Sequence, residues 1–197
     1  MWLVSALALS YARPLETGAW EISQDYKYFL DEGLAAEVAA LVRERGFSTL
    51  MDLGAGTGRY AAEWKKRGLS VTAYDGATNI ESLSAGLVRQ HDLTTPLPKC
   101  PASSVVTSLE VAEHIPADKQ DVYLYNLFCA KPRLVVISWA PAHQRGNGHV
   151  NGRTALYVRK LMRVRGYAHD PDATARLRAH ARLPWFKSNV QAFVAND

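Results

Sequence analysis

A glycine-rich turn between an expected strand and an expected helix constrains the fold of this chain more than any other feature. Residues 49–53 read TLMDL, a short apolar run typical of a buried strand, and residues 54–58 read GAGTG. Residues 60–67 have a helical pattern, and a second expected strand over residues 70–74 ends at Asp75. Strand, tight turn, helix and strand together form a β-α-β unit, in which the two strands run parallel.

The alternation of strands and helices continues along the chain. It predicts strands over residues 104–109, 133–139 and 189–194, and helices over residues 33–45, 119–130, 153–165 and 172–183. Such alternation is typical of an α/β protein with a doubly wound, mostly parallel, seven-stranded Rossmann-like sheet and helices on both faces. Ligands of these sheets bind at the carboxyl ends of the strands.

Length and composition exclude several classes of protein. The chain has 197 residues and no repeat or linker-like stretch, so we expect a single domain over residues 1–197. It has no run of about 18 apolar residues that could span a bilayer. Residues 1–12, MWLVSALALSYA, lack a basic residue and are shorter than a signal peptide. We therefore expect a packed or frayed terminal segment and a cytoplasmic protein.

Cys100 and Cys129 fit no metal spacing, and we expect no disulfide scaffold.

The net charge of +4 is unevenly distributed along the chain. Residues 1–132 carry 12 basic and 16 acidic side chains, whereas residues 133–197 carry 11 basic and 3 acidic ones. A basic final third could attract an anionic partner such as nucleic acid or a phosphorylated metabolite. It could equally consist of amphipathic helices with solvated, arginine-rich faces, because no aromatic residues are interleaved in a stacking pattern.

Three aspartates stand at or near the ends of successive expected strands. The dinucleotide-binding pattern G-x-G-x-x-G is absent, because Arg59 occupies the position of its third glycine. Asp52 directly precedes the turn, where a carboxylate would repel pyrophosphate but could receive the ammonium group of an amino-acid ligand. Asp75 is placed to accept hydrogen bonds from ribose hydroxyls, and Asp92 falls where the third strand should end.

With these features, residues 45–140 resemble a class I S-adenosylmethionine-dependent methyltransferase. The resemblance implies that the glycines wrap the methionine part, that Asp75 holds the ribose, and that Asp92 lies by the adenine. It divides the chain into an N-terminal segment and candidate lid (1–32), a cofactor-binding half (33–140) and an acceptor-side half (141–197). The implied cofactor-binding residues are Asp52, Gly54, Gly56, Gly58, Asp75, Gly76, Asp92, Leu93 and Glu110.

A cluster of acids and histidines follows the fourth expected strand. In residues 108–116, SLEVAEHIP, a helical turn would point Glu110, Glu113 and His114 to one side. His149 lies in the sequence GHVN, in a loop at the same edge of the sheet, and could complete the set. Carboxylate and imidazole groups in this mixture suit Mg²⁺, Mn²⁺ or another divalent ion.

The E-x-x-E-H cluster is similar to that of ubiquinone-pathway O-methyltransferases and small-RNA 2′-O-methyltransferases. That resemblance implies metal ligands at Glu110, Glu113, His114 and His149. Other members of the superfamily have a similar stretch and no established metal; there the acid faces the cofactor and the imidazole packs as structure. From Pro14 onward the chain also resembles little-characterised methyltransferase-like proteins with both motifs.

These features predict S-adenosylmethionine-dependent methyl transfer to a small-molecule acceptor, through oxygen, with a divalent metal as a further expectation. His149, His114 and Glu110 are the catalytic candidates, because an unperturbed imidazole titrates near neutrality. The alternatives are an RNA 2′-O-methyltransferase and a non-catalytic cofactor-binding protein. Adenine or cytosine amine methylation is disfavoured, since SLEVAEHIP stands where an N-P-P-Y motif would be.

Overall fold

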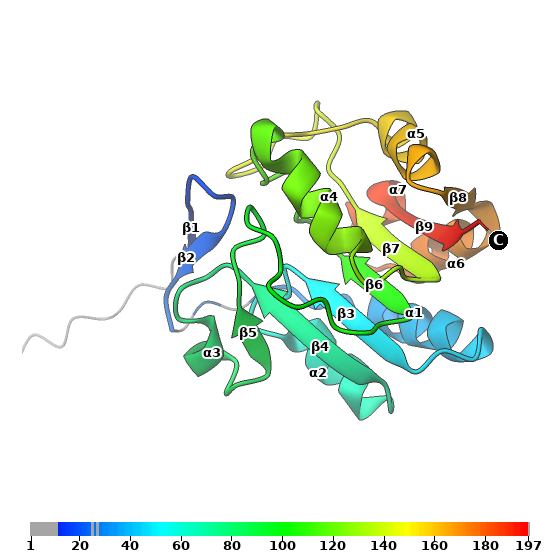
Figure 1. Ribbon diagram of the computed structural model, residues 1–197, viewed down its shortest axis with the longest axis horizontal. Coiled ribbons are helices and arrows are strands. Elements are labelled where there is room, and N and C mark those ends of the chain that lie inside the picture. The colour runs from blue at the N-terminus through cyan, green and yellow to red at the C-terminus, as the bar shows by residue number, and fades with distance from the viewer. Residues whose placement is uncertain (1–11, 25, 27, 197) are drawn as a thin grey trace, which may run out of the picture.

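The computed structural model describes residues 12–24, 26 and 28–196. Its centre is a seven-stranded sheet in the order β5-β4-β3-β6-β7-β9-β8 (Figure 1). The strand β9 runs antiparallel to its neighbours β7 and β8, and all other neighbouring strands of this sheet are parallel. The strands are β1 Ala12–Pro14, β2 Trp20–Ile22, β3 Thr49–Leu53, β4 Ser70–Asp75, β5 Val88–Gln90, β6 Val105–Ser108, β7 Leu134–Ser138, β8 Tyr167–Asp170 and β9 Val190–Ala195. The predicted α/β fold class is confirmed.

Helices cover both faces of the sheet, as predicted. The α-helices are α1 Glu32–Glu44, α2 Arg59–Lys66, α3 Ile80–Leu83, α4 Gln120–Phe128, α5 Ala155–Val164, α6 Pro171–His180 and α7 Phe186–Asn189, with a 3-10 helix η1 at Ala117–Lys119. Successive residues of a strand point to opposite faces. Leu50 of β3 therefore joins the core under α1, α2 and α6, whereas Met51 joins the core under α4 and α5.

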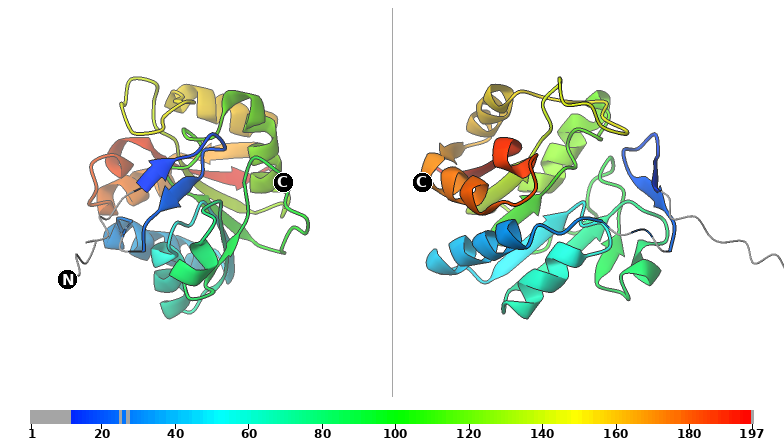
Figure 2. Two further views of the ribbon diagram at one scale, coloured as in Figure 1. Left: turned by 90° about the vertical axis from the view of Figure 1, so that its left-hand side faces the viewer. Right: turned by 180° about the vertical axis from the view of Figure 1, so that it is seen from behind.

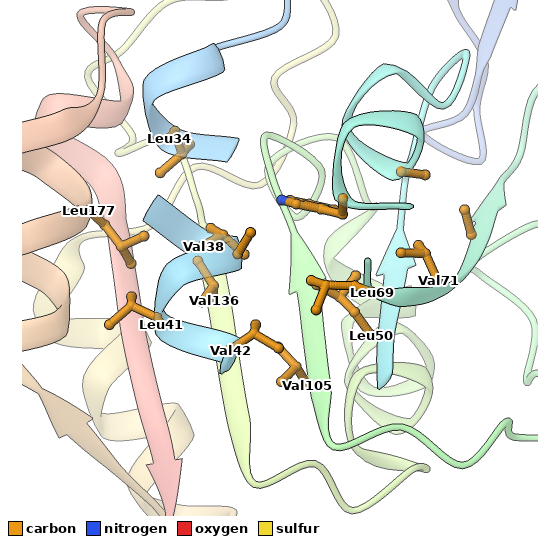
Figure 3. Packing of buried hydrophobic residues seen from close by; sticks show 14 of the residues in the cluster. Leu34, Val38, Leu41, Val42, Leu50, Leu69, Val71, Val105, Val136 and Leu177 are labelled. Carbon is orange, nitrogen blue, oxygen red and sulfur yellow. The ribbon is translucent and has the colours of Figure 1, made fainter. Parts of the chain in front are cut away.

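The first of these cores explains the position of α1. Leu34, Val38, Leu41 and Val42 repeat at helical spacing, and they pack on the strands and on Leu177 of α6 (Figure 3). The buried Asp31 caps the helix by accepting a hydrogen bond from Leu34 N at 2.9 Å. Its second oxygen accepts hydrogen bonds from the backbone N–H groups of Arg182 and Leu183, both at 2.7 Å. The start of α1 thus fixes the chain that follows α6.

The strand order reverses beside β3. The chain runs outward from β3 to β4 and β5, then returns to place β6 on the other side of β3. A crevice forms at the carboxyl edge of the sheet at such a reversal, and it is the usual ligand site of doubly wound folds.

Several elements differ from the sequence-based expectation. The strand β8 was not expected, because its sequence YAHD is short and acquires strand geometry only by antiparallel pairing with β9. The hairpin of β1 and β2 was not expected either. Among the described residues no helix combines the length and apolar character needed to cross a membrane. The expectation for the apolar N-terminal segment concerns residues 1–11, outside the described residues, and Ala12, which begins β1.

The two cysteines correct another expectation. Cys100 and Cys129 are joined by a disulfide, with their Cα atoms 5.8 Å apart. It ties the segment between β5 and β6 to the residue that ends α4. Cys100 and Cys129 are 29 residues apart in sequence, and only the packing of α4 beside the preceding loop brings them together.

Candidate active site

A cavity of about 230 Å³ opens at the carboxyl edge of β3, β4 and β6. Its walls are the glycine turn, the segment after β6, the β1–β2 hairpin, and aromatic side chains from residues 26–29 and 185–186. The predicted site residues that line it are Asp52, Gly54, Gly56, Asp75, Gly76, Asp92, Leu93, Glu110 and His114. The structure therefore places most of the residues predicted to bind the cofactor along one cavity.

The glycine turn needs its glycines for close approach. Gly54 has a φ of 79°, and a Cβ there would lie 2.2 Å from a methyl group of Val111. Gly56 has a φ of 53°, and a Cβ there would lie 2.9 Å from the ring of Tyr28. Gly58 has a different role from the expected one: it precedes α2 in a left-handed conformation, faces Val88, and does not line the cavity.

Asp75 is held firmly by the turn that it faces. One of its carboxylate oxygens accepts a hydrogen bond from Gly56 N at 2.8 Å, and the other accepts one from Ala77 N at 2.9 Å. Burial raises its pKa above the usual value. A Cβ on the neighbouring Gly76 would lie 2.6 Å from the Cβ of Ala19 in the hairpin. The acid that ends β4 is therefore fixed between the glycine turn and the cover of the site.

Asp52 is the second buried acid of the cavity. It accepts a hydrogen bond from Thr107 Oγ1 at 2.7 Å, and only 3% of its surface is exposed. Burial raises the pKa of Asp52 to about 7, the Thr107 hydrogen bond opposes this, and the charge of Asp75 adds to it. A carboxyl group with this pKa is poised to accept a cationic ligand group.

The Asp92 end of the cavity is shaped by a residue that the sequence analysis missed. Asp92 accepts hydrogen bonds from the N–H and the hydroxyl of Thr94, at 2.8 and 2.7 Å. The buried Asn126 of α4 donates to Leu93 O and to Thr95 O, and accepts from Leu97 N. An asparagine within a helix has no sequence signal for this role, which depends on the loop that packs against it.

The β1–β2 hairpin lies over the carboxyl edge of the sheet; that it acts as a lid stays a prediction. Figures 1 and 2 show it beyond the ends of β3 and β4, beside the loop that follows β7. A Cβ on Gly18 would lie 2.3 Å from the carbonyl oxygen of His114, and one on Gly148 would lie 2.8 Å from Pro14. The ring of Trp20 meets that of His114 edge-on, with centroids 5.3 Å apart.

Three of the four predicted metal ligands converge beneath this hairpin. The ligand atoms of Glu113, His114 and His149 all lie within 4.8 Å of one another. Glu113 is fully buried, and neither of its carboxylate oxygens has a hydrogen-bond partner among the described residues. Burial and the adjacent charge of Glu110 raise its pKa well above the usual range. We refer to these three residues as the triad.

The two histidines of the triad have defined tautomers. His114 Nδ1 lies 3.0 Å from Gly148 O, and His149 Nδ1 lies 3.0 Å from Gln144 O. A carbonyl oxygen only accepts hydrogen bonds, so Nδ1 carries the proton in each ring and Nε2 has the free lone pair. Burial lowers the pKa of His114 to about 4, so this imidazole is neutral near pH 7.

Glu110 lies outside the triad, because no helical turn begins at the end of β6. Glu110 has a φ of 56°, a left-handed conformation that is uncommon outside glycine, and the chain continues through a turn. Its N–H donates to Ser138 Oγ at 2.7 Å, and its carboxylate accepts a hydrogen bond from Asn189 Nδ2 at 2.9 Å. Its side chain thus belongs to the larger cavity, between the glycine turn and the triad.

Solved structures share this architecture. The chain superposes on magnesium protoporphyrin IX methyltransferase ChlM from Synechocystis PCC 6803, with a TM-score of 0.63, 15% identity, and coverage of 84% of this chain and 83% of that one. It superposes on the sugar N-methyltransferase KedS8 from Streptoalloteichus sp ATCC 53650 with a TM-score of 0.63, 14% identity, and coverage of 87% and 96%. No protein-family model and no curated protein matches the chain.

The fold is therefore that of the S-adenosylmethionine-dependent methyltransferases. A further neighbour is the methyltransferase domain of bacterial CtHen1-C, with a TM-score of 0.63, 16% identity, and coverage of 84% of this chain and 98% of that one. The ChlM structure contains bound SAH. At these identities the likeness concerns the fold.

Proposed function

We propose that this protein transfers a methyl group from S-adenosylmethionine to an oxygen atom of a small-molecule acceptor. The observation that carries the proposal is the contact of Asp75 with the N–H of Gly56, which joins the glycine turn and the strand-end acid in one cavity. In this fold the cavity lies where the strand order reverses.

The residues of the cavity suit each part of the cofactor. Asp75 would accept hydrogen bonds from the ribose hydroxyls with the lone pairs that its two backbone contacts leave free. Asp52 would receive the ammonium group, and Asp92 with Leu93 would border the adenine. The bound cofactor supplies a methyl group on a sulfonium, a good leaving group, so the protein contributes mainly orientation and exclusion of water.

The triad fits a divalent metal. A fully buried carboxylate without a hydrogen-bond partner is costly, and a bound cation would compensate it. The two free Nε2 lone pairs add nitrogen ligands to the oxygen of Glu113. The metal would lower the pKa of an acceptor hydroxyl. Glu110, whose carboxylate faces the cavity beside the triad, would orient the acceptor or the cofactor rather than act as a fourth ligand.

The proposal is tested by following methyl transfer from labelled S-adenosylmethionine to a panel of hydroxylated acceptors with Mg²⁺ or Mn²⁺. We expect turnover in the wild-type protein and none in Glu113→Gln, which should retain affinity for S-adenosylhomocysteine. Full activity after treatment with a chelator would contradict the proposed role of a divalent metal. His114 or His149 would then be the candidate base that removes the proton of the acceptor hydroxyl. Bound cofactor without any product would favour the non-catalytic alternative.

A second candidate, RNA 2′-O-methyl transfer, is favoured by the triad and by the superposition on the CtHen1-C domain. Against it, several basic side chains of the final third are already paired with acids: Arg165 with Asp121, Arg176 with Glu37 and Glu44, and Arg182 with Glu32. RNA affinity that falls steeply with salt would support this candidate, because phosphate contacts release counterions.

A further inference from the structure

A second pocket is lined by His149 and, among the described residues, shares no lining residue with the main cavity. It has a volume of about 550 Å³ and is formed by Ala117 and the loop between β7 and α5. This size is within the range of small-molecule sites. His149 belongs both to the wall of this pocket and to the triad. A ligand bound in the pocket would therefore lie beside the proposed metal site.

The pocket is lined by two arginines and no acid. Arg145 and Arg153 line it, together with the polar side chains of Gln144 and Asn151. Within the described residues, neither arginine forms an ion pair with a carboxylate. They differ in this from Arg165, Arg176 and Arg182 of the same basic third. The two arginines therefore leave an excess of positive charge in a concave surface.

Arg153 is held in place by an aromatic ring. Its guanidinium carbon lies 4.8 Å from the centroid of the Tyr157 ring. Its Nε is buried and has no hydrogen-bond partner among the described residues. Stacking fixes the plane of the guanidinium group and lowers the entropy lost when it binds a ligand. Because a buried N–H group without an acceptor is energetically costly, this Nε–H favours the binding of a ligand that can accept a hydrogen bond.

The loop that carries these arginines is anchored at several points. The N–H groups of Val150 and Asn151 donate to Glu113 O, both at 2.9 Å, and Arg153 N donates to Ala140 O at 2.9 Å. Trp139 Nε1 donates to Asn151 O at 2.7 Å. The pocket is therefore tied directly to the backbone of the triad.

We propose that the methyl acceptor is an anion, whose phosphate or carboxylate group binds Arg145 and Arg153 while its nucleophilic atom lies at the triad. This inference rests on the proposed function and narrows its substrate class. The planar fork of an arginine matches the paired oxygens of either group, and two such forks can hold one anion. Because His149 belongs to both the pocket and the triad, one small molecule that carries an anionic group and a nucleophile would contact both.

The test uses inorganic phosphate and benzoate as probes of the two anion types. The Nε–H resonance of Arg153 is followed by NMR during titration of the wild-type protein, Arg145→Gln and the control Arg163→Gln, which changes an exposed arginine of α5. Arg153→Gln lacks this resonance, so its titration is followed by backbone amide shifts. We expect a saturable shift with at least one probe. We also expect about tenfold weaker binding in Arg145→Gln, unchanged binding in the control, and, from backbone shifts, weaker binding in Arg153→Gln.

The outcomes separate this inference from the proposed function. Tighter binding of phosphate identifies a phosphorylated acceptor, and tighter binding of benzoate identifies a carboxylic acid. No saturable shift, or equal weakening in Arg163→Gln, overturns the inference, even if S-adenosylhomocysteine binds.

Absence of S-adenosylhomocysteine binding overturns the proposed function, and with it the assignment of the anion as an acceptor. A single-stranded RNA oligomer that binds far more tightly than either probe, through the same arginines, overturns the small-molecule acceptor.

Discussion

Among single residues, the buried Asp52 lowers the stability of the folded protein near neutral pH. Its pKa of about 7 means that folding removes the charged carboxylate from water at a cost. Because the pKa of Asp52 is raised, the folded protein keeps a proton that the unfolded chain releases once the pH exceeds about 3.9. The contribution of Asp52 to stability is therefore fully present below pH 4 and is lost as the pH rises to 7.

Replacing Asp52 by Asn should stabilise the ligand-free protein at pH 8. The amide oxygen can still accept the Thr107 hydrogen bond, and the charge penalty disappears. We expect a gain of roughly 2 to 4 kcal/mol in the free energy of unfolding at pH 8, shrinking toward pH 4, measured in urea. Affinity for S-adenosylhomocysteine should fall about tenfold. A variant that is less stable at pH 8, or a gain that does not change with pH, would contradict this account.

Gly146 is a residue whose role only the structure shows. A Cβ there would lie 2.2 Å from His149 Nε2 and 2.5 Å from its Cε1. Gly146→Ala should therefore displace the imidazole and weaken Mn²⁺ binding by tenfold or more, as measured by the paramagnetic signal of the free ion. Affinity for S-adenosylhomocysteine is the internal control and should not change. Unaltered Mn²⁺ affinity in the folded variant would exclude His149 as a ligand.

At the scale of elements, the disulfide and Asn126 hold the segment that contains Asp92. The disulfide closes a loop of 29 residues, which would destabilise the unfolded chain by about 3.6 kcal/mol through lost loop entropy. We expect the double variant Cys100→Ser, Cys129→Ser to lose about this much stability to urea. Neither cysteine lines the cavity, so cofactor affinity should persist. Equal stability of the variant and the wild-type protein would show that the bond contributes nothing.

The elements divide into those that local pattern specifies and those that pairing specifies. Leu34, Val38 and Leu41 repeat every three or four residues, so α1 was predictable from its own sequence. The strand β8 and the β1–β2 hairpin were not, because three or four residues carry little pattern and depend on a partner strand. Glu110 also departs from the pattern of its own sequence, because its left-handed backbone replaces the expected helical turn.

At the scale of the whole molecule, the sheet unites acids that are far apart in sequence. Asp52, Asp75 and Asp92 were predictable as a group, since parallel strands end at one edge. The second pocket was not predictable, because Arg145 and Arg153 resemble every other basic residue of the final third until their partners are known. In the described structure Arg165, Arg176 and Arg182 pair with carboxylates, whereas Arg145 and Arg153 have no carboxylate partner and line one pocket.

The central claim is that the glycine turn and Asp75 bind S-adenosylmethionine, and calorimetry with S-adenosylhomocysteine tests it most directly. We predict one saturable site in the wild-type protein and at least a hundredfold loss of affinity in Asp75→Ala, because the buried ribose would lose charge-assisted hydrogen bonds. Circular dichroism would confirm that the variant is folded. Folded wild-type protein that binds neither S-adenosylhomocysteine nor S-adenosylmethionine would contradict the claim, as would unchanged affinity in the folded variant.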